Sequence, residues 1–129
     1  MQFDLSALIK AIPALLYGAS VTLRITVLSI AMGLVIGFVT GLARVWPNIV
    51  FRTVSSTYIE LIRGTPLLVQ IFIVYFGLPA LGLNLDPFIA GMIAMGINSG
   101  AYIGEIVRGG IESIAKGQME AARSLGLTY

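Results

Sequence analysis

The chain has 129 residues, of which 57% are hydrophobic and only 11% are charged, and its mean hydropathy is +0.96; soluble domains of this length carry far more charge, so the composition indicates a membrane protein. The net charge is +2, and Lys and Arg are spread along the chain, which argues against nucleic-acid binding. Cysteine and histidine are absent, which excludes thiol and imidazole chemistry and the usual zinc ligands, so we expect no metal site.

The N-terminal residues 1–19 are predicted to form an interfacial segment. Within them FDLSALIKAIPALLY, residues 3–17, carries Asp4 and Lys10 among apolar side chains, with a proline at position 13. This pattern is typical of a helix that lies on a membrane surface. We expect it on the outer surface, ahead of the first membrane-spanning helix.

Three apolar runs are long enough to cross a bilayer, because about 20 helical residues at ~1.5 Å rise span its ~30 Å hydrocarbon core. The predicted spans are residues 24–43, 65–85 and 87–105. In the second span Thr65 can cap the helix and Pro66 suits its first position, while Pro79 is expected to end or kink it. We therefore predict an all-α membrane protein with three transmembrane helices plus interfacial helices.

The segment between the first two spans is predicted to be an amphipathic helix on the inner surface. Its two faces consist of Val50, Val54, Tyr58 and Ile62 against Arg52, Ser56, Glu60 and Arg63. The distribution of Lys and Arg in the flanks favours an external N-terminus and a cytoplasmic C-terminal part. On this orientation Lys10 and Arg24 lie outside, whereas six basic residues lie inside: Arg44, Arg52, Arg63, Arg108, Lys116 and Arg123.

Glycines recur at every fourth residue in two of the spans. The first span carries Gly33, Gly37 and Gly41, and the third carries Gly96, Gly100 and Gly104. Such ladders let helix backbones approach closely where lipid offers no hydrophobic drive for association. They predict a packed bundle with partner helices, although glycine is also frequent in membrane helices generally.

One face of the third span is polar. Asn98, Tyr102 and Glu105 are spaced i, i+4, i+7, and at ~100° per residue they share one side of a helix. Polar groups inside a membrane are costly unless they face protein or water, so this face is a candidate wall of a polar pathway. Gln70, alone among apolar residues of the second span, is a further candidate. The residues alone leave open that these groups serve only as hydrogen bonds between helices and as the end of a span.

The closing segment, KGQMEAARSLGLTY at residues 116–129, is charged and rich in alanine. Gly117 is predicted to break the chain, a helix is expected over 118–125, and Gly126 suits a left-handed cap. A helix of about eight residues is marginal alone in water, so it needs a surface to dock on. Ala121, Ala122 and Leu125 would form its small docking face, and Glu120 would also complement the helix dipole. A solvated loop remains the alternative reading.

Three stretches carry a resemblance to a known family. EAARSLG, residues 120–126, matches the EAA-x-x-x-G core of the cytoplasmic loop in permease subunits of binding-protein-dependent ABC importers. YIELIRGTPLLVQIFIVYFGLP (58–79) and INSGAYIGEIVRGGIESIAKGQMEAARSLGL (97–127) resemble the polar amino acid branch, of the histidine, glutamine and arginine permease type. The resemblance covers nearly the entire chain, and three long segments in the right order make it specific.

The resemblance implies a multi-pass protein of the cytoplasmic (inner) membrane within a type I ABC importer permease bundle. Two permease subunits, identical or related, would form the pathway, two cytoplasmic ATPase subunits would power it, and an extracytoplasmic solute-binding protein would deliver a polar amino acid. Residues 20–129 would be part of an ABC transmembrane type-1 domain whose cytoplasmic coupling loop is 106–129. No cofactor is implied for this chain.

The same resemblance implies roles for particular residues. A coupling helix would sit in a cleft of the ATPase, carried here by Glu120, Ala121, Ala122 and Gly126. The amino acid's route would be lined by Gln70, Asn98, Tyr102 and Glu105. The family's loop continues past the glycine to an I-x-L-P element and further membrane helices, whereas this sequence stops at Tyr129. We therefore expect the chain to be the N-terminal part of a longer permease.

Two other classes of function are compatible with parts of the pattern. A small three-span membrane scaffold or channel subunit without ATP coupling could use the same glycine ladders and polar face, but it would not need the EAA-x-x-x-G helix. An intramembrane enzyme would need a nucleophile and a base, and no credible pair exists here, so we expect no enzymatic activity. The sequence does not identify the transported amino acid or decide between a homodimeric and a heterodimeric permease.

Overall fold

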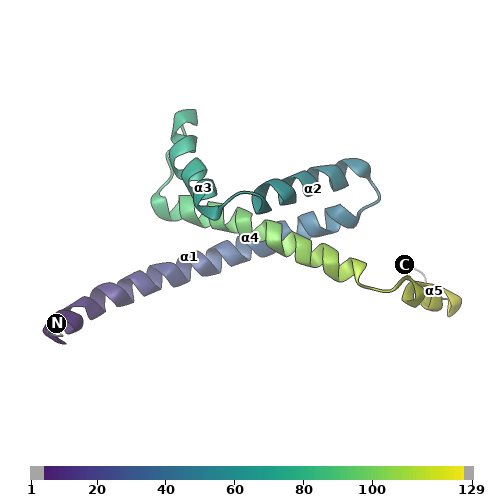
Figure 1. Cartoon of the computed structure of the whole chain (residues 1–129), viewed down its shortest axis with the longest axis horizontal. Helices are drawn as coiled ribbons and strands as arrows, with labels where there is room; N and C mark the ends of the chain where they lie inside the picture. The colour runs from purple at the N-terminus through teal and green to yellow at the C-terminus, as the bar shows by residue number, and fades with distance from the viewer. Residues whose placement is uncertain (1–4, 127–129) are drawn as a thin grey trace.

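The computed structural model describes residues 5–126, and every regular element among them is helical. In chain order these are α1 (Leu5–Val45), α2 (Ile49–Arg63), α3 (Leu67–Phe72), the π-helical η1 (Ile73–Gly77), the 3-10 helical η2 (Leu78–Leu81), α4 (Pro87–Glu112) and α5 (Lys116–Ser124). Figure 1 shows α1 crossing α4, with α2 beside the crossing and α3 directed away from it. The prediction of an all-helical protein is confirmed for these residues.

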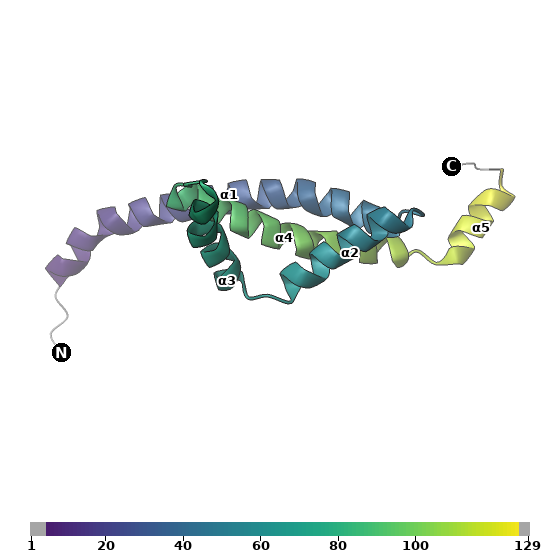
Figure 2. The same cartoon turned by 90° about the horizontal axis from the view of Figure 1, so that it is seen from above.

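The first helix, α1, is longer than the span predicted within it. Its 41 residues run without interruption through Pro13 and so join the predicted interfacial segment to residues 24–43. Pro13 removes a backbone donor and its ring crowds the preceding turn, but α1 continues through it as one helix. Asp4 lies outside the described residues, and the placement of residues 1–19 on a membrane surface stays a prediction. The N-terminal part of α1 extends well beyond the other helices (Figure 2).

The length and composition of α1 fit a membrane-spanning helix. Among the described residues, Ile9–Val45 is the one helix that is long and apolar enough by itself, and Ile49–Arg63 with Leu67–Leu81, bent by 104°, adds a second if counted as one span. Only 22% of the most apolar window of α1 is buried within the chain. The core helix of a soluble protein is covered on its apolar face, so this exposure favours lipid as the surrounding medium.

The two glycine ladders face each other where α1 crosses α4. All six glycines are buried. A methyl group added to Gly37 would lie 2.9 Å from the carbonyl oxygen of Gly100, and one added to Gly41 would lie 2.8 Å from that of Gly104. The predicted role in close helix packing is therefore confirmed, and the partner of each ladder is the other ladder. Ser29 adds a hydrogen bond across this interface, donated to the carbonyl of Met92 over 3.1 Å.

The amphipathic helix predicted between the spans is present as α2, and its packed face is only partly the predicted one, with Tyr58 and Ile62 half-buried. Ser55 and Ile59 are buried against the other helices, whereas Val50 and Val54 of the predicted apolar face are exposed. The reason is that α2 packs on the glycine-lined crossing, where Ile59 lies close to Gly104 and Tyr58 donates a hydrogen bond of 2.6 Å to the carbonyl of Ile97.

The chain turns sharply between α2 and α3, and the predicted capping there is wrong. Thr65 donates back to the carbonyls of Leu61 and Ile62 at the end of α2, and α3 has Pro66 at its N-cap with no side-chain cap bond. The helical run that begins with α3 ends at Leu81. The next residue, Gly82, has a left-handed φ of 82°. The α-helical form gives way to the π-helical η1 already at Ile73, before Pro79 is reached. The helical run is thus shorter than residues 65–85.

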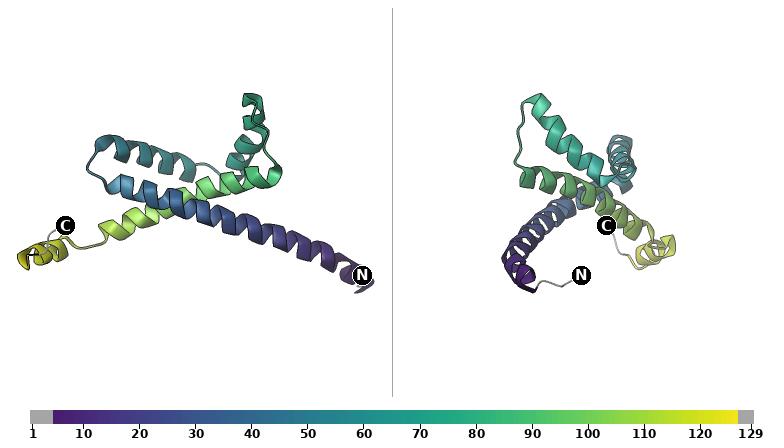
Figure 3. Two further views of the ribbon diagram at one scale, coloured as in Figure 1. Left: turned by 180° about the vertical axis from the view of Figure 1, so that it is seen from behind. Right: turned by 60° about the vertical axis from the view of Figure 1, so that its left-hand side comes forward.

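The closing segment forms a separate helix, α5, beyond the end of α4. It begins at Lys116 and includes Gly117, so the predicted break lies earlier, at residues 113–115. Glu120 consequently sits in the second turn and not the first, which removes the expected dipole role. Gly126 has a φ of 80°, as the predicted left-handed cap requires. No other described element packs against α5, and Figure 3 shows it lying apart from the crossed helices.

Candidate functional site

The polar face predicted on the third span is carried by α4. This helix begins with Asp86 as its N-cap, whose side chain accepts from the backbone N–H of Phe88, and with Pro87 at its first position. Asn98 is half-buried, and Tyr102 is 48% exposed. Glu105 lies one turn further toward α5, with 25% of its side chain exposed.

Gln70 and Asn98 are brought together by the packing of α3 on α4. The amide nitrogen of Asn98 donates to Oε1 of Gln70 over 3.2 Å. The amide nitrogen of Gln70 donates to the carbonyls of Ile62 and Thr65, over 2.8 and 3.0 Å. Gln70 is only 7% exposed. Its buried amide therefore donates to backbone carbonyls at the corner between α2 and α3 as well as contacting the polar face.

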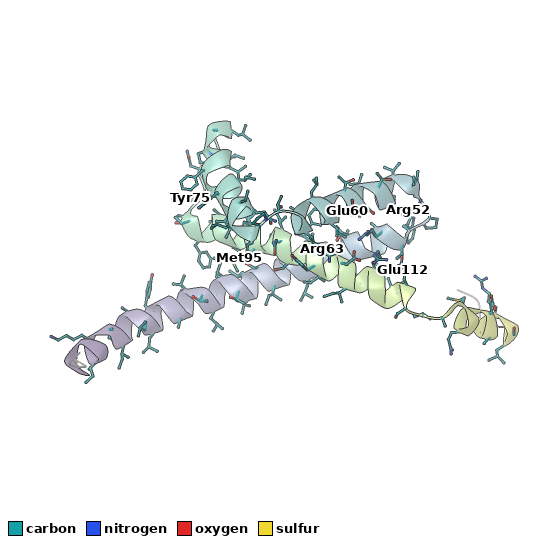
Figure 4. The ribbon with its side chains drawn as sticks, in the orientation of Figure 1. Arg52, Glu60, Arg63, Tyr75, Met95 and Glu112 are labelled. Atoms are coloured by element: carbon teal, nitrogen blue, oxygen red, sulfur yellow. The ribbon has the colours of Figure 1, made fainter. Side chains whose placement is uncertain are left out.

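Tyr102 and Glu105 are linked by an arginine that the sequence did not single out. The guanidinium carbon of Arg63, the last residue of α2, lies 5.4 Å from the centre of the Tyr102 ring. Its Nη1 atom is 3.6 Å from Oε2 of Glu105. Figure 4 places Arg63 where the end of α2 meets α4. This geometry combines a cation–π contact with a long ion pair.

Glu105 is surrounded by three guanidinium groups. Besides Arg63, its Oε2 pairs with Nη1 of Arg44 on α1, and its Oε1 lies 2.5 Å from Nη2 of Arg108. Arg108 also pairs with Glu112. Sequence reasoning missed this cluster. The available signal was an arginine in the last turn of α1 and of α2, together with a carboxylate at the end of the polar face.

Two grooves are relevant to the site. One of about 210 Å³ opens between the end of α2, the α3–η1 run and α4, and Thr65 and Gln70 are the polar residues of its otherwise apolar lining. A larger one, of about 690 Å³, lies along α1 and contains Arg24 and Phe88. None of the four predicted pathway residues lines the larger groove, so the smaller one marks the polar site better.

No group of three His, Cys, Asp or Glu side chains among the described residues could hold a metal ion. The carboxylates of the site, Glu105 and Glu112, are each paired with arginine. A carboxylate held in this way is a poor ligand for a further cation. What the site offers chemically is therefore hydrogen bonding and charge at a helix junction, without a reactive nucleophile.

The chain belongs to the family described as the binding-protein-dependent transport system inner membrane component, whose model matches residues 33–129. The matched region contains the polar face, the charged cluster and the closing segment. This assignment agrees with the all-helical fold and with the family resemblance of the sequence.

Individual relatives are similar along nearly the whole chain. It is 50% identical to the glutamine transport system permease protein GlnP of Escherichia coli (strain K12), over 99% of this chain and 59% of that protein. It is 45% identical to the arginine transport system permease protein ArtQ of Bacillus subtilis (strain 168), over 100% of this chain and 59% of that protein. The chain thus spans about three fifths of the length of these relatives.

Two further comparisons extend this picture. The L-cystine transport system permease protein TcyB of Bacillus subtilis (strain 168) is 44% identical over 91% of this chain and 50% of its own length. A solved chain from the crystal structure of an amino acid ABC transporter with histidines superposes with a TM-score of 0.92 and 43% identity, covering all of this chain and 60% of that one. The helix arrangement described above is therefore one that an amino acid ABC transporter adopts.

Proposed function

We propose that this protein is a permease subunit of an ABC importer that carries a polar amino acid across the cytoplasmic membrane. The observation that carries the proposal is the combination, in one chain, of a polar helix face on α4 with a separate, unpacked helix bearing the EAA-x-x-x-G pattern. A transport route needs a polar surface inside the membrane. Coupling to an external ATPase needs a segment on which the ATPase can dock. Similarity to permeases named for glutamine, arginine and cystine transport supports an amino acid as the solute.

In this proposal the chain contributes three spans to the permease. They are α1, the bent α2–α3 unit with its η1 and η2 continuation, and α4, with the N-terminal end of α1 outside and α5 in the cytoplasm. The excess of arginine and lysine at the α5 side supports this orientation. Residues 106–129 then form the coupling loop of an ABC transmembrane type-1 domain.

The route of the amino acid follows the polar face of α4. Asn98 and Tyr102 line it, Gln70 faces them from α3, and Glu105 closes it toward the cytoplasm. The exposure of Tyr102 and the groove beside Gln70 support this placement. Polar side chains here would replace the hydration shell of a zwitterion inside the membrane.

The energy for transport would reach the permease through α5. Glu120, Ala121 and Ala122, with the turn at Gly126, would dock on a cytoplasmic ATPase, and a second permease subunit and a solute-binding protein would complete the importer. The small side chains of Ala121 and Ala122 permit close approach to a groove. A nine-residue helix with no tertiary partner among the described elements gains stability from such a docking surface.

The test is co-purification of the ATPase with the detergent-solubilised full-length gene product. We expect a P-loop ATPase to be recovered, and recovery to fall at least roughly tenfold when Glu120 is replaced by lysine, because a carboxylate at the docking face is inverted in charge. The matched control is Glu60→Lys, which makes the same change on the exposed surface of α2. Membrane insertion should be unchanged in both variants.

Two results would contradict the proposal. Recovery of no ATPase with a folded wild-type protein would favour a membrane scaffold or channel without ATP coupling. Equal recovery with Glu120→Lys and Glu60→Lys would remove the docking role of α5 while leaving the permease assignment in place.

A further inference from the structure

Glu105 joins three helices at the end of the bundle nearest the closing segment. Its Oε2 pairs with Arg44 of α1 and lies 3.6 Å from Arg63 of α2, while its Oε1 is 2.5 Å from Arg108 of its own helix. Arg44 also donates from Nε to the hydroxyl of Ser56 on α2, over 3.1 Å. A single carboxylate thus links residues from α1, α2 and α4.

The charges around Glu105 leave little room for a substrate ammonium. Both carboxylate oxygens already accept from guanidinium groups, and three arginines face two carboxylates when Glu112 is included. The local charge is therefore positive, and it would repel the ammonium group of a substrate. The side chains of Arg44 and Glu105 are only 17% and 25% exposed, so solvent and salt screen their interaction less than that of a surface pair.

The cluster continues directly toward α5. Arg108 pairs with Glu112, the last residue of α4, and α5 begins four residues later at Lys116. Only residues 113–115 separate α5 from this helix end, which is tied to α1 and α2 through Glu105. Charge-assisted hydrogen bonds of this kind fix geometry as well as adding strength.

We propose that Glu105 is a positioning residue that makes the adjoining ends of α1, α2 and α4 move as one body when the closing segment is displaced. The inference rests on the proposed function, since it assigns the means by which movement at α5 reaches the route. On this view Glu105 acts through Arg44 and Arg63 and not by binding the amino acid.

A double-mutant cycle tests the proposal. Glu105→Gln, Arg44→Gln and the double variant are made in the full-length gene product, co-expressed with its ATPase, with Glu60→Gln as the control on an exposed carboxylate of α2. The first measurement is the thermal unfolding midpoint in detergent. The second is uptake of labelled L-glutamine and L-arginine by proteoliposomes, together with ATP hydrolysis. If Glu105→Gln does not fold, Glu105→Asp takes its place.

We expect both single variants to lower the unfolding midpoint. The midpoint of the double variant should be no lower than that of the less stable single variant, because the contact between Arg44 and Glu105 is already lost in each. Amino acid moved per ATP should fall at least roughly threefold in each single variant, while KM stays within about twofold and Glu60→Gln behaves as wild type.

Additive effects on the midpoint would overturn the proposal. So would a rise in KM of roughly tenfold in Glu105→Gln that Arg44→Gln does not share, because that result marks a substrate ligand. A wild-type protein that takes up neither amino acid and recruits no ATPase would instead count against the proposed function. The thermal cycle would still decide whether Glu105 and Arg44 act as one unit.

Discussion

Glycine at positions 37 and 41 allows α1 and α4 to touch backbone to backbone. A methyl group on Gly37 would come within 2.5 Å of the Ile103 side chain and 2.9 Å of a carbonyl oxygen of α4. The Ile103 methyl group could rotate away, but its Cβ, 2.6 Å from the added methyl, and the carbonyl oxygen are fixed to the α4 backbone, so these contacts can be relieved only by separating the helices. Close packing here matters because dispersion and hydrogen bonds, not the hydrophobic effect, hold helices together in lipid.

Gly37→Ala is expected to destabilise the helix crossing by about 1–3 kcal/mol, the usual cost of overpacking. The matched control is Gly18→Ala in the same helix, because a methyl group there meets nothing within 4 Å. Alanine at that position should instead be neutral or stabilise α1 by about 0.5–1 kcal/mol. Thermal unfolding of the detergent-solubilised full-length product measures both. Equal midpoints for the two variants would show that the crossing tolerates a wider spacing.

Among the elements, the corner between α2 and α3 depends on Gln70. The chain leaves α2 after Arg63 and turns by 104° into the next helical run. The turn leaves the carbonyls of Ile62 and Thr65 outside the helical hydrogen-bond pattern. The amide nitrogen of Gln70 donates a hydrogen bond to each of them. Its oxygen then accepts from Asn98, which ties the corner to α4.

Gln70→Met keeps a similar volume and removes all of these hydrogen bonds. We expect the free energy of unfolding to fall by about 1–3 kcal/mol, because the hydrogen bonds to Thr65 and Asn98 are lost together and the half-buried Asn98 amide loses this acceptor. Amide hydrogen exchange should become faster in residues 61–70 than in α1. Gln118→Met, on the exposed surface of α5, is the control and should change neither. Unchanged exchange at the corner would mean that the hydrogen bonds of Gln70 do not stabilise the turn between α2 and α3.

At the scale of the whole molecule, a large apolar surface remains uncovered. Leu16, Leu23, Val35 and Phe38 of α1 are all more than half exposed, as are Ile73 and Phe76 of η1. Such a surface requires lipid or partner helices around it. The charged cluster around Glu105 instead lies where the C-terminal parts of α1, α2 and α4 meet.

The proposed orientation gives a direct prediction for intact cells. Residues 1–129 contain no cysteine, so a single introduced cysteine reports on its own position within this region. With other cysteines of the full-length product removed, Lys10→Cys should react with a membrane-impermeant maleimide from outside, and Gln118→Cys only after permeabilisation. Labelling of both from outside, or a reversed pattern, would contradict the assignment of α5 to the cytoplasm.

The helical class and the close-packing residues follow from local features of the sequence. Apolar runs without charge predict helices for lipid, and the four-residue spacing of glycine predicts close contact whatever the partner. These features are readable because each depends on composition or on the period of a single helix.

Other features depend on which helices meet. Arg44 and Glu105 are separated by 61 positions, and nothing local to either residue indicates the other. The same holds for the packed face of α2, where Ser55 and Ile59 replaced the predicted valines, and for Thr65, which closes α2 and does not cap α3. The sequence by itself determined the all-helical class, the close contact at the glycine ladders and the polar face of α4. The tertiary structure alone decided how charge and hydrogen bonds are shared among its helices, because those energies arise only between groups that folding brings into contact.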